Sequence, residues 1–411
     1  MPAITVIIPN HNHTLYIGDA IRSVLRQTYR DFEIVVVDDG STDNCRDVVA
    51  AFRGPVRYVW QENQGLAGAR NAGFRCAEGE LIGLLDADDE WLPVFLEQML
   101  VLAKRHPEAV AYYCGAKGMD EAGQDLPQVF GTPARNPQRL YQELLRTNFI
   151  IPSTVVIRRS AILAAGLFDP KLRSCEDWDL WLRLLPEHSL VGLSNCLVRY
   201  RIHANTLSTR AESMQAAARA VIEKNFGPED ENETAWSAEK RRAYGGLFRY
   251  HTLTSVQRSR DWTAASRYLV RALRFDPSLA DDLGLFYDLA LGPQPQGYRG
   301  TLHELHLRQN AVNMETLIES ICDPGVYTNR SVARRVRGTA SFAIGLLAYN
   351  TRDLSFSFRH MLRAFWFKPS LVRDKRAVGA FLKSLLGRSL LRQLKVTKAK
   401  LLRALAQRAP A

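Results

Sequence analysis

The sequence predicts an α/β sheet domain in roughly the first half of the chain and an all-helical region after it. Short apolar runs rich in β-branched residues recur through the first 115 residues, at residues 4–8, 32–37, 56–60, 81–85 and 109–113. Fully apolar strands that are joined by helices are typical of a mostly parallel sheet covered on both faces. Beyond about residue 210 only helical patterns remain. The predicted fold class is therefore α/β followed by all-α.

Periodicity also predicts the elements between and after these strands. Apolar residues between the first two strands recur at helical spacing, namely Ile17, Ile21, Val24 and Leu25. Residues 116–150 are rich in Gly, Pro, Asp and Gln, so we expect a long irregular excursion on the surface. A strand, an amphipathic helix and a second extended segment are expected at residues 154–157, 176–185 and 190–200.

Length and charge limit the organisation of the chain. A length of 411 residues favours two or three domains. The net charge of +11 comes from the C-terminal end, because residues 371–411 hold eleven Lys or Arg and one acidic residue. Six scattered cysteines without paired spacing predict reduced thiols and no structural zinc. The N-terminus shows no basic, cleavable leader, so we expect a cytoplasmic protein.

The helical half contains one internal repeat. Residues 260–279 match residues 352–371, and each copy begins with Arg-Asp and ends in a Pro-Ser-Leu segment. A helix followed by Pro-Ser resembles the second helix of a tetratricopeptide-type unit. We therefore predict three domains: a sheet domain at 1–210, a helical-hairpin domain at 211–376 and a basic tail at 377–411.

Polar residues follow the first two predicted strands at the points where these strands end. Pro9 and Asn10 close the first strand, and Asp38 and Asp39 close the second. Ligands of parallel α/β sheets bind beyond the carboxyl ends of the strands. A carboxylate there would accept hydrogen bonds from a nucleotide base or ribose, although an Asp-Gly pair also stabilises turns without any ligand.

The fourth strand ends in three carboxylates. Asp86, Asp88 and Asp89 follow it within four residues, and carboxylates so close together repel one another unless a cation neutralises them. Oxygen ligands of this kind favour Mg²⁺ or Mn²⁺, which proteins hold with one or two carboxylates plus substrate phosphate oxygens. The sequence therefore predicts a divalent-metal site at this strand end.

Two helix starts carry further candidates. Arg70 lies in the helix before the fourth strand, where a guanidinium would match phosphate oxygens or simply face solvent. Glu176 and Asp177 begin the predicted helix at 176–185. The positive end of a helix favours ionised carboxylates, so these residues either complement the helix dipole or supply a general base.

Taken in order, these segments resemble the family 2 glycosyltransferases. The matching blocks are PNHN at 9–12, QTYRDFE at 27–33, VDDGSTD at 37–43, ARN at 69–71, DADD at 86–89, FD at 168–169 and EDW at 176–178. The resemblance covers about residues 3–210, which is half of the chain. One departure is His11, at a position where the family often has a tyrosine.

The resemblance implies a GT-A nucleotide-sugar-binding fold and a role for each matching residue. It implies that the donor is bound by Pro9, Asn10, Asp38 or Asp39, Arg70 and Asp86. Asp88 would bind Mn²⁺ or Mg²⁺, and His203 would reach the metal or the diphosphate from a later loop. Asp177 would deprotonate the acceptor hydroxyl, and one displacement would invert the anomeric carbon. The expected donor is a UDP-sugar, and the expected acceptor is a saccharide or lipid-linked glycan of cell-surface polysaccharide assembly.

Three other functions remain open from the residues. A nucleotidyltransferase would normally carry a Gly-rich basic loop after the first strand, where this chain has PNHN. A scaffold that binds nucleotide sugars without activity would not need Asp88 and Asp177. A processive polysaccharide synthase would show a Gln-x-x-Arg-Trp block, and here residues 257–262 miss that spacing by one residue.

The basic tail predicts an amphipathic helix. Apolar residues recur about every four positions from 378 to 405, with Lys and Arg largely between them. Such a helix would bind an anionic membrane surface, and the protein would then be peripheral on the inner membrane face. The alternative is that its leucines pack on the helical domain. Nucleic acid is not expected, because the tail has no aromatic residue after Phe381 for base stacking.

Overall fold

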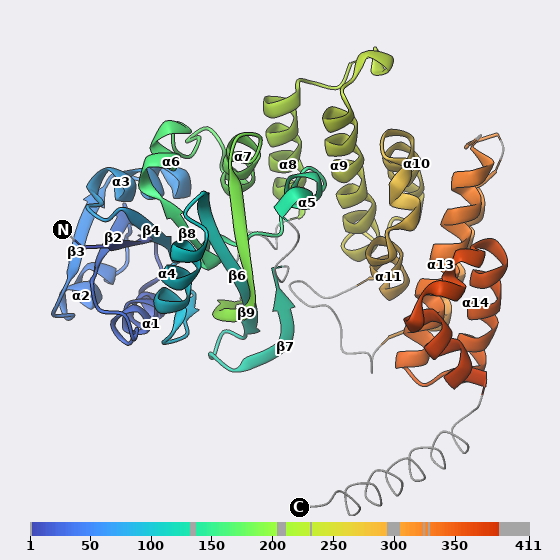
Figure 1. The fold of residues 1–411 in the computed structure, drawn as a ribbon, viewed down its shortest axis with the longest axis horizontal. Coiled ribbons are helices and arrows are strands. Elements are labelled where there is room, and N and C mark those ends of the chain that lie inside the picture. The colour runs from blue at the N-terminus through green and yellow to red at the C-terminus, as the bar shows by residue number, and fades with distance from the viewer. Residues whose placement is uncertain are drawn as a thin grey trace, which may run out of the picture. The chain divides into compact units, whose positions relative to one another are not determined.

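The computed structural model describes residues 2–131, 137–203, 211–230, 232–293, 305–323, 325–327 and 329–385. The chain forms two compact units, Met1–Leu247 and Phe248–Ala411, and each is described here by itself. The first unit contains the sheet, and the second contains helices only among its described residues. The predicted order of an α/β region followed by an all-α region is confirmed (Figure 1).

Within the described residues the sheet has nine strands, in the order β3-β2-β1-β4-β8-β6-β9-β5, with β7 paired to β6. Their bounds are β1 Ile4–Asn10, β2 Phe32–Asp39, β3 Val56–Gln61, β4 Leu81–Leu84, β5 Glu90–Trp91, β6 Ala109–Met119, β7 Asp125–Phe130, β8 Val155–Arg158 and β9 Ser189–Arg201. The strands β1 to β4 are all parallel, as predicted. Beyond β4 the sheet is mixed, because β8 runs antiparallel to both β4 and β6.

Helices cover both faces of the parallel part of the sheet. The helices of the first unit are α1 Thr14–Leu25, α2 Cys45–Ala50, α3 Gly65–Cys76, α4 Phe95–Arg105, α5 Pro137–Leu144, α6 Arg159–Ala164, α7 Glu176–Leu184 and α8 Ala211–Phe226, and α9 Ala238–Gln257 begins in it. Buried side chains of α1 and α4 share one core with β1 and β2, whereas α3 packs with β2 on the opposite face. The approach of α3 is close, because a Cβ on Gly73 would lie 2.4 Å from Ile7 Cγ2.

The register of the strands brings their polar ends together. Asn10 at the end of β1 is paired with Asp38 near the end of β2, and Ile7 is paired with Leu84 at the end of β4. The loop that follows β4 therefore begins beside the loop that follows β1. The sequence predicted the candidate site at this edge of the sheet, where the parallel strands have their carboxyl ends.

The prediction for residues 116–150 was wrong. The strand β6 continues to Met119, β7 forms a hairpin with it, and α5 follows. Gly115 and Gly118 allow close packing inside the sheet. A Cβ at Gly115 would lie 2.9 Å from Cys196 Sγ, and one at Gly118 would lie 3.1 Å from the Phe130 ring.

The first compact unit is longer than the predicted sheet domain of residues 1–210, because α8 and the first part of α9 pack on it. Asp179 on α7 is fully buried, and its carboxylate accepts hydrogen bonds from Lys224 Nζ at 2.9 Å and Asn225 Nδ2 at 3.0 Å. These contacts hold α8 to α7. The division of the chain into three functional domains stays a prediction.

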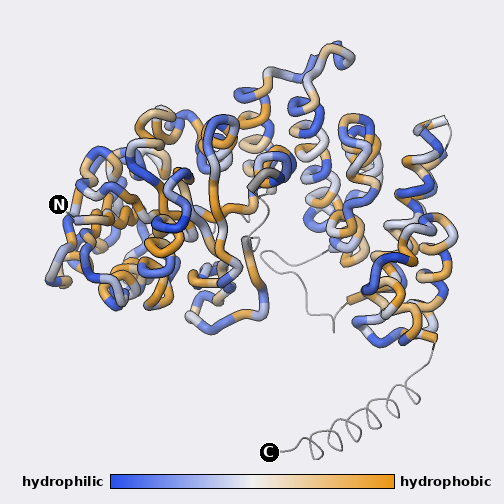
Figure 2. The backbone as a smooth tube through the Cα atoms, viewed as in Figure 1, coloured by the Kyte–Doolittle hydropathy of each residue, from blue (hydrophilic) through white to orange (hydrophobic). Residues whose placement is uncertain are grey.

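The second unit is built from helical hairpins. Besides the end of α9 its helices are α10 Trp262–Phe275, α11 Leu283–Leu291, α12 Leu307–Ile321, α13 Arg330–Asn350 and α14 Leu354–Phe367. Hydrophilic and hydrophobic residues alternate along them, as expected for amphipathic helices (Figure 2). Residues 375–385 are also α-helical, and their Ala377 and Ala380 are buried against side chains of α13 and α14.

The sequence repeat corresponds to a structural repeat. Arg260 and Arg352 both have left-handed backbones, with φ of 55° and 65°. The residue after each, Asp261 or Asp353, accepts a hydrogen bond from a backbone N–H in the first turn of α10 or α14. Each helix is followed by a short 3₁₀ turn that starts at a proline. The matching sequences therefore encode the same cap, helix and terminating turn.

Most of the predicted basic tail, residues 386–411, lies outside the described residues. Its prediction as an amphipathic helix therefore stays a prediction. No helix among the described residues is both long and apolar enough to span a membrane.

Candidate functional site

A cavity of about 600 Å³ opens at the carboxyl ends of β1, β2 and β4. Most of the residues that the sequence singled out line it, namely Pro9, Asn10, Asp39, Arg70, Asp86, Asp88, Glu176, Asp177 and His203. The cavity is also lined by Leu15, Tyr16 and Met214, which add apolar surface. Its size suits a ligand larger than a single sugar or a nucleobase alone.

The two carboxylates at the end of β2 face different surroundings. Asp38 does not line the cavity, because its carboxylate accepts hydrogen bonds from Ser41 N, Cys45 Sγ and the Tyr58 hydroxyl. Burial raises the pKa of Asp38, but these hydrogen bonds outweigh it and lower the net pKa below the usual value. Asp38 therefore stabilises the turn after β2, which the Asp-Gly pattern also allowed.

Asp39 is the carboxylate at this strand end that meets the cavity. Its oxygens accept hydrogen bonds from Gln61 Nε2 at 2.6 Å and from the backbone N–H groups of Gln64 and Gly65 at 2.8 Å. Its carbonyl oxygen lies 2.9 Å from His11 Nδ1. Asp39 thus ties the β1 loop to the start of α3 and fixes the wall of the cavity.

Asn10 carries an unsatisfied atom beside this wall. Its Nδ2 donates to Ser41 Oγ at 3.3 Å, whereas its buried Oδ1 has no hydrogen-bond partner among the described residues. A buried acceptor without a partner is costly, and such atoms often await a ligand or water. Pro9 precedes it, is buried and also lines the cavity.

Arg70 forms the centre of a buried charge cluster rather than a free phosphate-binding fork. Its side chain is 1% exposed, and its guanidinium donates to Asp86 Oδ1 at 2.6 Å and to Glu176 Oε1 at 2.5 Å. The two carboxylates raise the pKa of Arg70 against the lowering effect of burial. Arg70 therefore orients the loop after β4 and the start of α7 toward each other across the cavity.

Asp89 anchors the loop after β4 to the protein interior. This side chain is buried, and it accepts hydrogen bonds from Ser153 Oγ at 2.5 Å and from the backbone N–H of Arg201 at 2.9 Å. Arg201 in turn donates from Nε to the Asp88 carbonyl oxygen at 2.8 Å. Burial and the neighbouring Asp88 and Asp86 raise the pKa of Asp89 well above its usual value. Asp89 thus has a structural role, whereas Asp86, which is paired with Arg70, and Asp88 line the cavity.

Asp88 has a partner that the sequence predicted and a neighbour that it missed. Its Oδ2 lies 2.9 Å from His203 Nε2. The ligand atoms of His13, Asp88 and His203 all lie within 4.8 Å of one another, so these residues are able to hold a metal ion together. His13 follows the PNHN block but has no counterpart in the quoted motifs, so only its position in space identifies it. Both imidazoles and the carboxylate are ordinary ligands of divalent transition metals.

Asp177 is a carboxyl with a raised pKa at the edge of the cavity. It is partly exposed to the cavity, and its Oδ2 accepts a hydrogen bond from Asn148 Nδ2 at 2.7 Å. Burial and the adjacent Glu176 charge raise the pKa of Asp177 to about 7, against the lowering effects of Arg70 and Asn148. The residue before the pair, Cys175, has a left-handed backbone with φ of 60°. Strained backbone of this kind is concentrated at functional sites.

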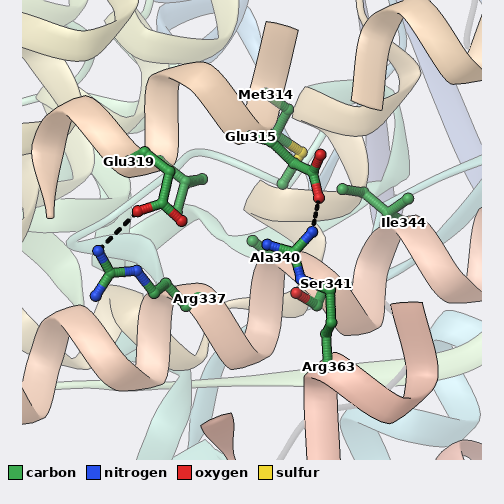
Figure 3. A pocket seen from close by; sticks show the side chains of 9 residues that line it. Met314, Glu315, Glu319, Arg337, Ala340, Ser341, Ile344 and Arg363 are labelled. Carbon is green, nitrogen blue, oxygen red and sulfur yellow. Dashed lines mark hydrogen bonds and ion pairs between the residues drawn. The ribbon is translucent and has the colours of Figure 1, made fainter. Parts of the chain in front are cut away.

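One pocket of the second unit is of a different kind. It lies between α12, α13 and α14, and ion pairs between Glu315 and Arg363 and between Glu319 and Arg337 flank it (Figure 3). Its volume of about 10 Å³ leaves room for about one water molecule. This pocket does not qualify as a ligand site.

Comparison with known proteins identifies the first unit. Residues 5–164 match the family model described as glycosyl transferase family 2. An uncharacterized glycosyltransferase of Rickettsia typhi is 31% identical over 218 residues, which are 52% of this chain and 69% of the relative. A putative teichuronic acid biosynthesis glycosyltransferase, TuaG of Bacillus subtilis, is 32% identical over 214 residues, 51% of this chain and 82% of the relative.

Among solved structures, residues 1–349 of TarS from S. aureus superimpose with a TM-score of 0.49 and 20% identity, covering 79% of this chain and 92% of that chain. The strand-end carboxylates Asp38, Asp39, Asp86 and Asp88 lie within residues 5–164, which the family model matches. On the family match and these relatives, the chain belongs to glycosyltransferase family 2 and is a glycosyltransferase.

Proposed function

We propose that this chain transfers a sugar from a nucleotide-diphospho-sugar to a hydroxyl acceptor, with a divalent metal and with inversion at the anomeric carbon. The observation that carries the proposal is the shared cavity. It combines a set of metal-ligating side chains around Asp88 with Asp177, a carboxyl whose pKa is raised to about 7. These are the two groups that a single displacement with a diphosphate leaving group requires.

Asp177 is the proposed base. A pKa near 7 makes the carboxylate available and gives it a useful affinity for a proton. It would take the proton of the acceptor hydroxyl while that oxygen bonds to the anomeric carbon and the bond to the diphosphate oxygen breaks on the opposite side. Glu176 is engaged by Arg70, so it is less suited to this role. Asn148 orients the Asp177 carboxylate by its hydrogen bond.

Asp88 and His203 are the proposed metal ligands, with Mn²⁺ or Mg²⁺ as the ion. When bound, such an ion neutralises the charge that develops on the diphosphate as it leaves. Asp86 lies in the same loop but is held by Arg70, so we assign it to the donor side of the cavity. The Asp88 main chain is fixed by Arg201, which keeps its carboxylate directed at the cavity.

The nucleotide would bind at the ends of β1 and β2, where Asp39 and the unsatisfied Asn10 Oδ1 lie. We propose a UDP-sugar donor. TuaG is described as a putative enzyme of teichuronic acid biosynthesis, and a further relative, 24% identical over 266 residues, is a chondroitin synthase of Escherichia coli. These names support an acceptor that is a growing saccharide, free or linked to a lipid, in polysaccharide assembly.

A panel of nucleotide sugars with Mn²⁺ would test the proposal. Release of the nucleoside diphosphate from one donor, with the product's anomeric configuration read by NMR, is the expected result. Retention of configuration would contradict the single displacement. Turnover of no donor under any metal condition, despite donor binding, would favour the inactive scaffold. Formation of pyrophosphate from a nucleoside triphosphate would favour the nucleotidyltransferase.

We also infer that the protein binds an anionic membrane surface through α14 and the segment after it. Leu362 and Trp366 are 47% and 77% exposed, one turn apart on α14, and Val372 is 61% exposed. Residues 354–385 contain seven Lys or Arg and one acidic residue. An exposed Trp and Leu among cationic side chains suits the headgroup boundary of an anionic bilayer. The chain continues into residues 386–411, which add seven more basic residues and no acidic one.

Co-sedimentation with vesicles tests the membrane surface. Full-length protein should bind vesicles that contain anionic lipid and should not bind neutral vesicles. Trp366→Ala and removal of residues 386–411 should each weaken this binding. Trp60→Ala is the matched control, because Trp60 is 58% exposed on β3 in the other unit. Binding that ignores lipid charge, or that survives both changes, would overturn the inference.

A further inference from the structure

We propose that His13 is a third protein ligand of the metal, so that His13, Asp88 and His203 form a site with two histidines and one carboxylate. Such a site would select a transition-metal ion such as Mn²⁺ over Mg²⁺, and would hold it before the nucleotide sugar arrives. The inference rests on the proposed function for the use of the ion, but it concerns the ion-binding residues themselves.

The positions of the ligand atoms support the site. Ligands at 2.0–2.2 Å from one metal ion lie at most about 4.4 Å apart. The three ligand atoms lie within 4.8 Å of one another, and His203 Nε2 is 2.9 Å from Asp88 Oδ2. Small rotations of the side chains would therefore bring all three atoms to one ion. The Asp88–His203 hydrogen bond would open as the ion inserts.

The backbone around His13 directs its ring to this place. His13 occupies the position before α1, and its carbonyl oxygen accepts from the N–H groups of Tyr16 and Ile17 at 2.9 and 3.0 Å. Its side chain makes no capping hydrogen bond, unlike the short polar residues that usually stand there. The imidazole lies edge-on to His203 instead, with 6.1 Å between ring centroids. The helix start thus fixes the ring without using its nitrogens.

Tyr16 and Arg201 hold the other two proposed ligands, His203 and Asp88, in position. The ring centroids of Tyr16 and His203 lie 5.4 Å apart. The Arg201 guanidinium lies over the Tyr16 ring, with its Cζ 4.7 Å from the ring centroid. Arg201 is 3% exposed and also binds the Asp88 carbonyl oxygen. Groups that orient ligands in this way raise the affinity and the precision of a metal site.

The donor set determines which ion fits. Mg²⁺ prefers oxygen ligands and is usually held by one or two carboxylates plus substrate phosphates. Imidazole nitrogens suit transition metals, and three protein ligands leave further positions for diphosphate oxygens. A site made only of the carboxylates after β4 would need phosphate oxygens of the nucleotide to hold its ion. The site of His13, Asp88 and His203 would hold the ion without the nucleotide.

The test is calorimetric titration of the nucleotide-free full chain with Mn²⁺ and with Mg²⁺. Wild type should bind Mn²⁺ more tightly than Mg²⁺. His13→Gln should weaken Mn²⁺ binding at least about tenfold, since even indirect partners of a metal cost 10- to 100-fold when lost. Electron spin-echo spectra of bound Mn²⁺ should show two nitrogen ligands in wild type and one in His13→Gln.

His11→Gln is the matched control. It changes a histidine of the same loop whose Nδ1 faces the Asp39 carbonyl and which is not in the triad, so Mn²⁺ affinity should stay at the wild-type value. Wild-type Mn²⁺ affinity in His13→Gln, or no Mn²⁺ binding by the nucleotide-free chain, would overturn the inference. Metal-dependent sugar transfer in such a protein would leave the proposed function standing. Conversely, a triad that binds Mn²⁺ in a protein that transfers no sugar would refute the function and not the site.

Discussion

The two compact units differ most in what they bury. The sheet unit buries charged side chains close to the cavity of about 600 Å³ at its strand ends, including Asp39, Arg70, Asp89 and Glu176. In the helical unit ion pairs such as Glu319 with Arg337 keep partial exposure. Its pocket between α12, α13 and α14 measures about 10 Å³, and a second pocket of about 470 Å³ beside residues 305–309 is lined by Arg308 and Asp353, which are partly exposed.

This difference has an energetic meaning. Burying charges is costly, and replacing a buried ion pair with apolar groups is often neutral or stabilising. A fold that needed only stability would therefore not require the Asp86–Arg70–Glu176 cluster. The cluster instead fixes two loops that face one cavity. In the described part of the helical unit, the ion pairs beside the pocket between α12, α13 and α14 are partly exposed instead.

The largest expected effect is on catalysis at Asp88. Asp88→Asn removes the charge of the proposed metal ligand, while the amide is still able to hydrogen-bond to His203. We expect sugar transfer to fall at least about a thousandfold, because loss of metal stabilisation costs several kcal/mol. Thermal unfolding should change little. Full wild-type activity in the presence of a strong chelator would contradict metal dependence.

The next effect concerns the base. Asp177→Asn keeps the shape of the side chain but accepts no proton, so kcat should fall about 10²- to 10⁴-fold while donor binding persists. In wild type, kcat/KM should rise with pH through about 7, because the base acts in its deprotonated form. Normal turnover by Asp177→Asn, together with loss of turnover in Glu176→Gln, would move the base to Glu176.

A third change tests the buried cluster. Arg70→Met leaves the carboxylates of Asp86 and Glu176 without their cation, and breaking a buried pair in this way costs about 3–5 kcal/mol. The free energy of unfolding from a urea titration measures the loss. A change below about 1 kcal/mol would mean that water or another group replaces Arg70.

Asp177 should also affect stability in a pH-dependent way. Its folded pKa of about 7 lies above the ordinary carboxyl value, so its contribution to stability is fully present at low pH and is lost as pH rises through about 7. Asp177→Asn does not ionise. The melting temperature of Asp177→Asn minus that of wild type should therefore increase by a few degrees between pH 5 and pH 8. A constant difference across this range would mean that the pKa is not raised.

The smallest effect is expected in the helical unit. Glu319→Gln breaks an ion pair with Arg337 in which the two side chains are 55% and 27% exposed. Such pairs contribute up to about 1 kcal/mol, and sugar transfer should be unaffected. A destabilisation as large as that of Arg70→Met would erase the contrast between the two units.

The sequence by itself determined the local elements and the positions of most site residues. Apolar runs predicted β1 to β4 and β8, and the helix starting at Glu176 was predicted to within one residue. The carboxylates at the strand ends could be found because parallel strands end at one edge of a sheet. The repeat in the helical region predicted two equivalent helices because caps and terminating prolines act within a few residues.

Tertiary structure alone decided how those residues are used. Arg70 is paired with Glu176, 106 positions away, and Asp38 is turned into the core by Tyr58. His13 becomes a candidate ligand only because β9 brings His203 beside the loop after β1. A sequence pattern predicts helices, strands and caps, because these depend on residues that are close together in the chain. Which charge neutralises which, and which carboxylate is left to face a cavity, depends on contacts between distant segments that only the assembled sheet brings together.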